Sequence, residues 1–419
     1  MTSVPAAGPP PQRPRVRELG LRVGLMPPGP TNTIVDVPGV AVGHRTVWRD
    51  EPDPPAGRGT ARTGVTAILP IPLEAMARTR IPAGTSVLNG AGEMTGRIAI
   101  DEWGTLETPI FLTSSMAVGR VYDGAVEALA GPFTAGFLGD PIMPVVAECD
   151  DSDLNRPFPV QVDVADVRAA IGAARGSEGG PVAMGVVGAG TGMRAFELKA
   201  GIGSASRIVR PIHRWSDDPQ PDAPTFTVGV LVMANFGVID RLTVDGVRVG
   251  EVLRAEGWPA RGGGIPVHTI RGRGGHASGD GHAGGERRAA GEGSAIVVVA
   301  TDAPLFALPL QRLARRAGLG LARTGSVGHH GSGEIFVAFS TGIRIPRGRN
   351  EPVRTTAHLD EEHLDPFFAA VVEAVEEATL DALATADAVS GRDGRVIAGL
   401  PIDRTLELLR AAGRLDGRR

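Results

Sequence analysis

The sequence lacks several features that mark particular classes of protein. Its single cysteine, Cys149, excludes an intramolecular disulfide and a cysteine-rich metal site. No run of about 18 or more apolar residues occurs, so we expect no membrane-spanning helix. Acidic residues (47) outnumber basic ones (43), and the formal net charge of −4 argues against a nucleic-acid-binding protein.

Lysine is nearly absent as well. Lys199 is the only lysine among the 43 basic residues, so all the others are arginine. A GC-rich genome explains the general preference for arginine. A lysine that remains against this preference marks either a position where the planar guanidinium does not fit or a chance survivor.

The composition otherwise predicts a folded protein with a substantial core. Hydrophobic residues make up 42% of the 419 residues, which suits one large domain or two of average size. Residues 1–15 are rich in proline and contain no apolar stretch typical of a secretory signal. We therefore expect a disordered tail over residues 1–15, a single domain over residues 16–419, and a cytoplasmic location.

Apolar patterning predicts buried strands and a few amphipathic helices. Nearly continuous apolar runs, typical of strands covered on both faces, occur at Phe226–Ala234, Ala295–Ala300 and Ile335–Phe339, with shorter ones at Gly64–Pro70 and Pro109–Thr113. Helical spacing occurs over Met116–Ala130, Leu305–Ala317 and His363–Ala384, whereas Gly84–Gly96 has the composition of a loop. Strands and helices without regular βαβ repeats predict an α+β protein with layered sheets and helices outside.

One segment has too few apolar residues to join a core. Residues 271–293 include nine glycines in 23 positions and predict a flexible linker. Ser294 follows at once and leads into the apolar run Ala295–Ala300. A flexible tether that runs directly into a core strand suggests a break in the chain between Gly293 and Ser294.

Common motifs for cofactor, metal and nucleophile sites are incomplete. The stretch Val187–Met193 (VGAGTGM) lacks the third glycine and the later acidic residue of a dinucleotide-binding turn, so we interpret it as a tight backbone turn near a site. The histidines form no H-E-x-x-H pair, and no serine lies in a G-x-S-x-G elbow. We therefore expect neither a metal nor an organic cofactor.

Ser294 has the chemistry to supply its own general base. If the chain breaks before Ser294, the new α-amine lies beside the Ser294 hydroxyl. An α-amine has an ordinary pKa of about 7.7–8.0, so it can accept the hydroxyl proton near neutral pH without a histidine. An ordinary serine at the junction of a linker and a strand fits the same residues about equally well, so these residues alone leave both readings open.

Two further sets of polar residues lie at the ends of predicted core strands. Ser332 and Glu334 are two residues apart, which places both side chains on one face of an extended chain, where they can orient an amine. Asn235 follows Phe226–Ala234 and is well placed to donate a hydrogen bond to an oxyanion. A turn serine, a solvent-facing glutamate and a turn asparagine are the ordinary alternatives.

Several motifs in order resemble those of one family. This is the family of self-cleaving DmpA-type L-aminopeptidase/D-amidase/esterases and β-peptidyl aminopeptidases. The motifs are Asn32–Gly43 (NTIVDVPGVAVG), Leu88–Gly96 (LNGAGEMTG), Gly188–Met193 (GAGTGM), Lys199–Arg207 (KAGIGSASR), Thr227–Gly237 (TVGVLVMANFG), Gly293–Leu305 (GSAIVVVATDAPL) and Ala322–Ser340 (ARTGSVGHHGSGEIFVAFS). The resemblance spans roughly Val16 to Leu408, with residues 271–292 as an expansion.

The resemblance implies a fold and a processing step. The expected fold is a four-layer αββα sandwich similar to N-terminal nucleophile hydrolases but differently connected. Self-cleavage between Gly293 and Ser294 is expected to yield chains of residues 1–293 and 294–419. The processed pairs are expected to form a homo-oligomer.

The resemblance also implies the site. Carried over by motif, Ser294 is the nucleophile, Ser332 and Glu334 orient its amine, and Asn235 stabilises the oxyanion. Substrates of such a family carry a free amine, and Glu148 in the segment VVAECDDSD is our candidate to receive the corresponding ammonium. Some relatives have an aromatic residue around Asp150, where this chain has an acid. The resemblance therefore does not determine the shape of the substrate pocket.

We therefore expect a self-processing serine aminopeptidase or amidase that acts on small peptides, amides or esters with a free amine. Two other classes remain as alternatives. One is an acyltransferase of the ornithine acetyltransferase type, which has similar self-cleavage but exposes a threonine nucleophile. The other is a non-catalytic binding protein that stays uncleaved.

Overall fold

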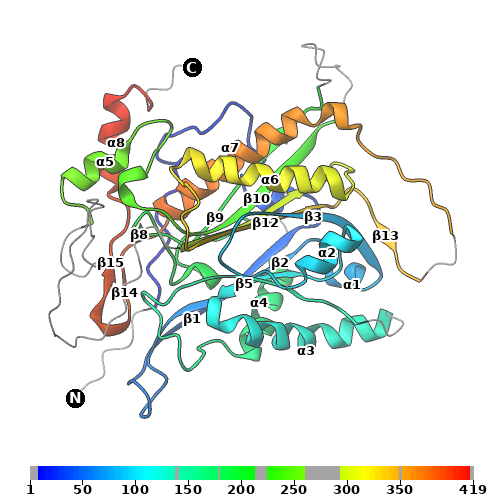
Figure 1. Cartoon of the computed structure of the whole chain (residues 1–419), viewed down its shortest axis with the longest axis horizontal. Coiled ribbons are helices and arrows are strands. Elements are labelled where there is room, and N and C mark those ends of the chain that lie inside the picture. The colour runs from blue at the N-terminus through cyan, green and yellow to red at the C-terminus, as the bar shows by residue number, and fades with distance from the viewer. Residues whose placement is uncertain are drawn as a thin grey trace.

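The computed structural model describes residues 8–136, 141–177, 180–212, 224–259, 293–348 and 352–415. Two β-sheets lie against each other, and helices cover the outer face of each (Figure 1). The expected αββα sandwich is therefore confirmed. Of the linker predicted over residues 271–293, residues 271–292 lie outside the described residues, and Gly293 belongs to strand β11 (Gly293–Thr301) rather than to a linker.

The smaller sheet has the strand order β1-β2-β5-β6. Its strands are β1 (Ala41–Asp50), β2 (Thr60–Leu69), β5 (Ile110–Ser114) and β6 (Val145–Cys149). Helices α3 (Val118–Gly136) and α4 (Val164–Gly176) cover its outer face (Figure 1). The apolar segments expected at Gly64–Pro70 and Pro109–Thr113 correspond to β2 and β5.

The larger sheet has the strand order β13-β3-β12-β11-β10-β9, and β4 (Thr105–Leu106) pairs with β3 off this path. The strands are β3 (Thr79–Gly90), β9 (Ile202–Val209), β10 (Phe226–Asn235), β11 (Gly293–Thr301), β12 (Ser332–Ser340) and β13 (Ile345–Pro346). Helices α6 (Ala307–Arg323) and α7 (Asp365–Ala384) pack on its outer face (Figure 1). Strands β11 and β12 run parallel, and α6 forms the crossover between them.

Strand β11 shows how both faces of the larger sheet are buried. Ile296 and Val298 belong to the apolar core between the two sheets, whereas Val297 and Val299 belong to the core beneath α6 and α7. Every residue of β11 is buried. The nearly continuous apolar runs in the sequence thus reflect strands covered on both sides, as expected.

One expectation about local structure is wrong. Residues 84–90 form the second half of β3 rather than a loop, because backbone pairing with β12 compensates for the glycine-, serine- and asparagine-rich composition. The segment before β1 contains the short 3₁₀ helix η1 (Ile34–Asp36).

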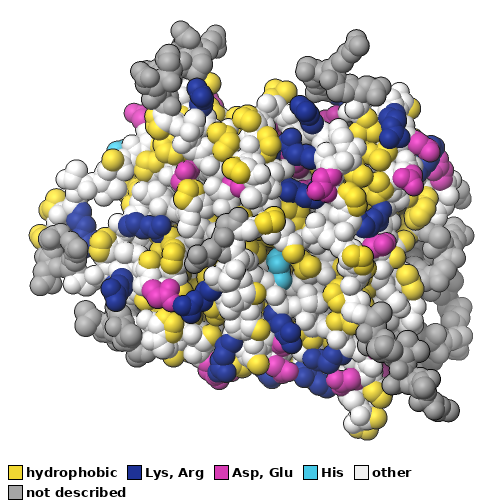
Figure 2. All heavy atoms as spheres, turned by 180° about the vertical axis from the view of Figure 1, so that it is seen from behind, with side chains coloured by type: hydrophobic (Ala, Val, Ile, Leu, Met, Phe, Trp, Pro, Cys, Tyr) yellow, Lys and Arg dark blue, Asp and Glu magenta, His cyan; other side chains and the backbone are white. Residues whose placement is uncertain are grey.

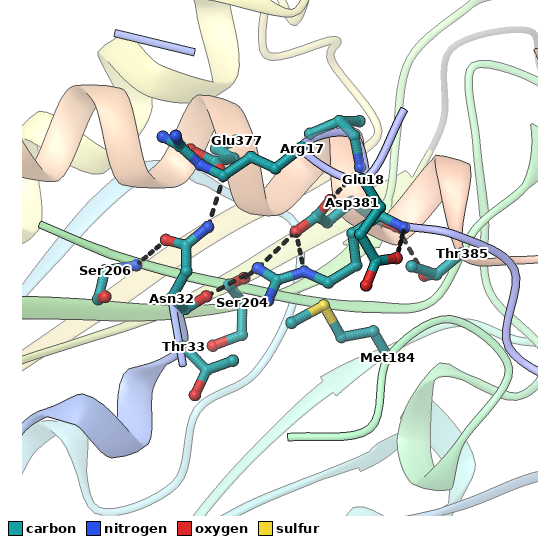
Figure 3. Close-up of polar contacts among 12 residues, drawn as sticks. Arg17, Glu18, Asn32, Thr33, Met184, Ser204, Ser206, Glu377, Asp381 and Thr385 are labelled. Carbon is teal, nitrogen blue, oxygen red and sulfur yellow. Dashed lines mark hydrogen bonds and ion pairs between the residues drawn. The ribbon is translucent and has the colours of Figure 1, made fainter. Parts of the chain in front are cut away.

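The described part of the N-terminal segment is held in place, which differs from the expected disorder up to residue 15. Arg15 Nε donates to the buried Asp381 Oδ2 at 2.8 Å, and Arg17 Nη2 donates to Glu377 Oε2 at 2.8 Å. Figure 3 shows Arg17 and Asn32 meeting Glu377, with Asp381 one turn further along α7. Buried carboxylates need cationic partners, so Arg15, from outside the predicted domain, supplies a partner to a carboxylate in its core.

Charged side chains are mixed over the surface. On the face in Figure 2, Arg side chains are interspersed with Asp and Glu, and apolar side chains lie between them. Within the described ranges, no helix has the length and apolar character needed to cross a membrane.

Candidate active site

Gly293 and Ser294 begin β11, in the middle of the larger sheet. Ser294 is only 4% exposed, and its Oγ donates a hydrogen bond to the Gly293 carbonyl oxygen at 2.7 Å. The hydroxyl therefore already lies beside the peptide group that precedes it. A Cβ built on Gly293 would lie 1.9 Å from the Asn235 carbonyl oxygen, so only glycine fits at this position.

Ser332 and Glu334 lie on the neighbouring parallel strand β12. Their side chains share one face, as the sequence predicted, and Ser332 Oγ donates to Glu334 Oε1. Within the part of the chain that the structure describes, the buried Glu334 Oε2 has no hydrogen-bond partner. Burial raises the pKa of Glu334, and donation from Ser332 opposes this. The pair thus retains a free acceptor oxygen for an incoming N–H group.

The register of β11 and β12 places this pair beside the backbone of Ser294. Gly293 is the register partner of Ser332, and Ser294 is the partner of Gly333. By strand alternation, Ser332 and Glu334 share the face of Gly293 and Ala295, opposite the face of the Ser294 hydroxyl. Any interaction with Ser294 from this pair is therefore directed at its main chain.

Asn235 ends β10, directly opposite Ser294 in the antiparallel β10–β11 pair. Side chains paired in this way share a face of the sheet, so the amide flanks the hydroxyl. Asn235 Oδ1 accepts from the Arg194 backbone N–H at 3.0 Å, and Nδ2 donates to the Asp150 carbonyl oxygen at 2.9 Å. The Nδ2 group has two N–H bonds, and this contact uses one of them.

Glu148 comes from the other sheet. It lies on β6, where Oε1 accepts from the Glu93 backbone N–H at 3.0 Å and Oε2 accepts from Ser115 Oγ. A Cβ built on Gly92 would lie 3.0 Å from Glu148 Oε1 and 3.7 Å from Gly333 Cα. Glu148 therefore approaches β12 at the residue that pairs with Ser294. Ser294, Asn235 and Glu148 thus lie toward one end of the space between the two sheets, whereas Ser332 and Glu334 lie on the opposite face of the larger sheet, beside the Ser294 main chain.

The turn before Arg194 contributes to this site in a way that the sequence only partly indicated. Gly188–Gly190 form the 3₁₀ helix η3, which confirms the tight turn expected over Val187–Met193, and the Arg194 N–H that follows it holds Asn235. The fully buried Lys199 and Asp151 lie beside this turn, and sequence reasoning assigned a role to neither. The only signal for Lys199 was that it is the single lysine.

Lys199 and Asp151 have strongly shifted pKa values. Burial lowers the pKa of Lys199 to about 7, and the negative charge of Asp151 opposes this. Burial raises the pKa of Asp151 to about 7, and hydrogen bonds from Ser114 and Asn155 oppose this. Both groups therefore lie in a poorly hydrated environment. They are close to the backbone groups of Arg194 and Asp150 that bind the Asn235 side chain.

The histidines that the structure describes form no metal site. His268, His276 and His282 lie outside the described residues, and the adjacent His329 and His330 precede β12. Among described residues, no group of three or more His, Cys, Asp or Glu side chains is arranged to hold a metal ion.

Comparison with known proteins decides the family. The model of peptidase family S58 matches residues 32–397, which is most of the chain. The chain belongs to peptidase family S58. It is 38% identical to the beta-peptidyl aminopeptidase BapA of Sphingosinicella microcystinivorans, over 96% of this chain and 93% of the relative.

Solved S58 relatives share the fold. The beta-aminopeptidase of a Burkholderia species is 38% identical, with a TM-score of 0.78 over 97% of this chain and 99% of that chain. The L-aminopeptidase D-Ala-esterase/amidase of Ochrobactrum anthropi is 35% identical, with a TM-score of 0.80 over 96% of this chain and 100% of that chain. The latter is described as a prototype for the serine aminopeptidases and a new variant of the Ntn hydrolase fold. This chain is a serine aminopeptidase with that fold variant. The comparisons therefore favour neither the acyltransferase nor the non-catalytic alternative.

Proposed function

We propose that this serine aminopeptidase processes itself between Gly293 and Ser294 and then hydrolyses amides and esters through an acyl-enzyme on Ser294. The observation that carries the proposal is the Ser294 hydroxyl, which lies 2.7 Å from the Gly293 carbonyl oxygen at the start of a core strand. The free Glu334 oxygen across the strand pair supports it.

Self-cleavage begins with an acyl shift. Ser294 Oγ attacks the Gly293 carbonyl carbon, the Gly293–Ser294 C–N bond breaks, and the hydroxyl proton is transferred to the departing nitrogen. Water then hydrolyses the ester, which leaves a carboxylate on Gly293 and restores the hydroxyl of Ser294. The new α-amine emerges in the sheet beside Ser332 and Glu334, which hold it.

Turnover uses the same groups. The α-amine of Ser294 accepts the hydroxyl proton as Oγ attacks the substrate carbonyl carbon, and returns it to the leaving amine or alcohol. The second N–H of Asn235 Nδ2 donates to the oxyanion that forms. Water then releases the acyl group, with the α-amine again as the base.

Substrate selection rests on charge. The carboxylate of Glu148 receives the ammonium of the substrate's amino end, because a charge-assisted hydrogen bond is the strongest contact available to that group. We propose small peptides, amides or esters with a free amine as substrates, in line with the aminopeptidase and esterase/amidase names of the relatives. A cytoplasmic location and a homo-oligomer of processed pairs belong to the same proposal.

Mass spectrometry of the purified protein tests the processing step. We expect two chains, the smaller of which begins Ser-Ala-Ile-Val. Ser294→Ala should remain one chain and hydrolyse nothing. Ser340→Ala removes a buried hydroxyl at the opposite end of β12 and should process normally. A fragment that begins elsewhere, or hydrolysis by uncleaved Ser294→Ala, contradicts the mechanism.

β-Alanyl, L-alanyl and D-alanyl p-nitroanilides test the substrate class. Each carries a free amine, so Glu148→Gln should raise KM for all three much more than it lowers kcat. N-Acetylated versions of the same substrates lack the ammonium and should be poor substrates of the unaltered enzyme. Equal hydrolysis of acetylated and free-amine substrates contradicts the role of Glu148.

A further inference from the structure

The only lysine of the chain is buried against main-chain carbonyls. Lys199 lies in β8 (Leu198–Lys199) and is fully buried. Its Nζ donates to the carbonyl oxygens of Met193 at 2.7 Å, Gly190 at 3.3 Å, and Ala200. A protonated amine has three N–H bonds on one compact atom, which matches three converging acceptors, whereas the flat fork of arginine does not.

These carbonyls belong to the backbone that holds Asn235. Gly190 and Met193 lie in the turn that ends at Arg194, and Arg194 N–H donates to Asn235 Oδ1. Strand β7 (Arg194–Ala195) also pairs with β8, and Arg194 is the register partner of Lys199. Lys199 therefore holds Arg194 both through strand pairing and through the turn that precedes it.

The other end of the Asn235 amide is connected to the same turn. Its Nδ2 donates to the carbonyl oxygen of Asp150, and Asp151 follows immediately. A Cβ built on Gly192 would lie 2.6 Å from Asp151 Cβ, so the turn packs directly against this residue. Both partners that orient the amide thus lie on backbone segments that meet beside Lys199.

We propose that Lys199 is a positioning residue that fixes the 190–194 turn, so that Arg194 holds the Asn235 amide with its second N–H directed at the oxyanion. This inference rests on the proposed role of Asn235 in the reaction of Ser294. The contacts described for Lys199 Nζ are with main-chain oxygens of the turn and of Ala200, which follows β8, so it acts through Asn235 rather than on the substrate.

A double-mutant cycle on processed enzyme tests the proposal. Lys199→Met keeps the aliphatic stem and removes the donors. We expect kcat to fall by about 10-fold to 10²-fold, because a small misplacement of a catalytic group costs up to about 10²-fold. KM should change by less than about twofold, because transition-state contacts rather than ground-state binding are lost. In the Asn235→Ala background, Lys199→Met should cost almost nothing more, because the group that it positions is already gone.

Thr379→Val is the matched control. Thr379 is fully buried in α7, and its Oγ1 donates to the main-chain carbonyl of Val375 in the same helix, outside the 190–194 turn. Its kcat should stay near that of the unaltered enzyme. An equal loss from Thr379→Val, or the same loss from Lys199→Met with and without Asn235, overturns the proposal. Where a variant processes slowly, the rate of self-cleavage is the readout of the same cycle.

A measurement without substitution covers the case in which Lys199→Met does not fold. Labelling with [ε-¹³C]lysine gives one signal, because the chain has one lysine. Phenylmethylsulfonyl fluoride attached to Ser294 places a sulfonyl oxygen at the oxyanion position, and we expect the lysine signal to move. An adduct on Ser294 with an unmoved lysine signal overturns the inference and leaves the proposed function standing. Failure of Ser294 to form any adduct counts against the proposed function as well.

Discussion

Gly293 and Asn235 approach so closely that a Cβ on residue 293 would lie 1.9 Å from the Asn235 carbonyl oxygen. The neighbouring atom is main chain in the centre of a sheet and has little freedom to move. The space at residue 293, just before the scissile bond, therefore accommodates only glycine. Its substitution disturbs the same strand pair that holds Ser294 opposite Asn235.

We predict that Gly293→Ala blocks or strongly slows self-cleavage, because the added methyl group pushes β11 away from β10 at the reacting peptide. Gel electrophoresis under denaturing conditions over several days of incubation measures the processed fraction. Gly284→Ala, in the preceding linker, is the control and should process like the unaltered chain. Complete processing of Gly293→Ala would show that the close contact does not restrict the reaction.

We predict that Glu334→Ala lowers kcat more than Ser332→Ala does. A carboxylate makes the stronger, charge-assisted hydrogen bond to the Ser294 amine, and Ser332 also acts by donating to that carboxylate. A general base contributes about 10²–10⁴-fold, which bounds the effect of misplacing the amine. Steady-state kinetics on processed enzyme measures both, with KM expected to change less than kcat. A larger loss from Ser332→Ala would reverse the assigned order.

We predict that the [ε-¹³C]lysine signal titrates with a midpoint near pH 7, because burial lowers the pKa of Lys199 to about 7 from an ordinary value of 10.5. Between these two pH values the unfolded chain binds one proton more than the folded chain, so the contribution of Lys199 to stability rises with pH. Urea unfolding of the uncleaved Ser294→Ala chain, with and without Lys199→Met, measures this. The difference in unfolding free energy should shift in favour of lysine from pH 7 to pH 9. A signal that titrates above pH 10 contradicts this prediction.

We predict that Glu377→Gln destabilises the protein by up to about 3–5 kcal/mol, because it removes the carboxylate partner of Arg17 and one of the two carboxylate partners of the buried Arg207, which also pairs with Glu373. Glu377 is fully buried and pairs with Arg207 at 2.7 Å and with Arg17. Asp387→Asn is the control, since the Asp387–Arg13 pair is exposed and spans 3.9 Å, and it should change stability by less than about 1 kcal/mol. Urea unfolding of the Ser294→Ala chain compares the two. Equal effects would show that burial does not govern these pairs.

The sequence predicted those parts of the fold in which the burial of a segment matches the apolar pattern of its own residues. Strand β11 and helix α7 were recognisable because continuous apolar runs and helical spacing match their burial. The second half of β3 was not, because its strand conformation depends on pairing with β12 rather than on its own composition. The anchoring of Arg15 on Asp381 joins residues 366 positions apart, and no local pattern predicts such a contact.

The candidate site divides in the same way. Ser332 and Glu334 share a face because of spacing along one strand, which a sequence shows directly. The side chain of Asn235 is oriented by backbone groups of Arg194 and Asp150, and backbone groups carry no sequence signal of their own. The role inferred for Lys199 likewise depends on contacts with backbone groups, so no sequence motif indicated it.

The strand order of the larger sheet determines what the proposed cut does to the molecule. Strands β11 and β12 come from the segment after Gly293, yet they lie between β3 and β10, which come from the segment before it. The cut therefore separates no part of the structure and turns one folded chain into two subunits that share a sheet. Refolding of the processed enzyme after denaturation then becomes a bimolecular reaction whose yield depends on protein concentration, whereas the uncleaved chain refolds independently of concentration.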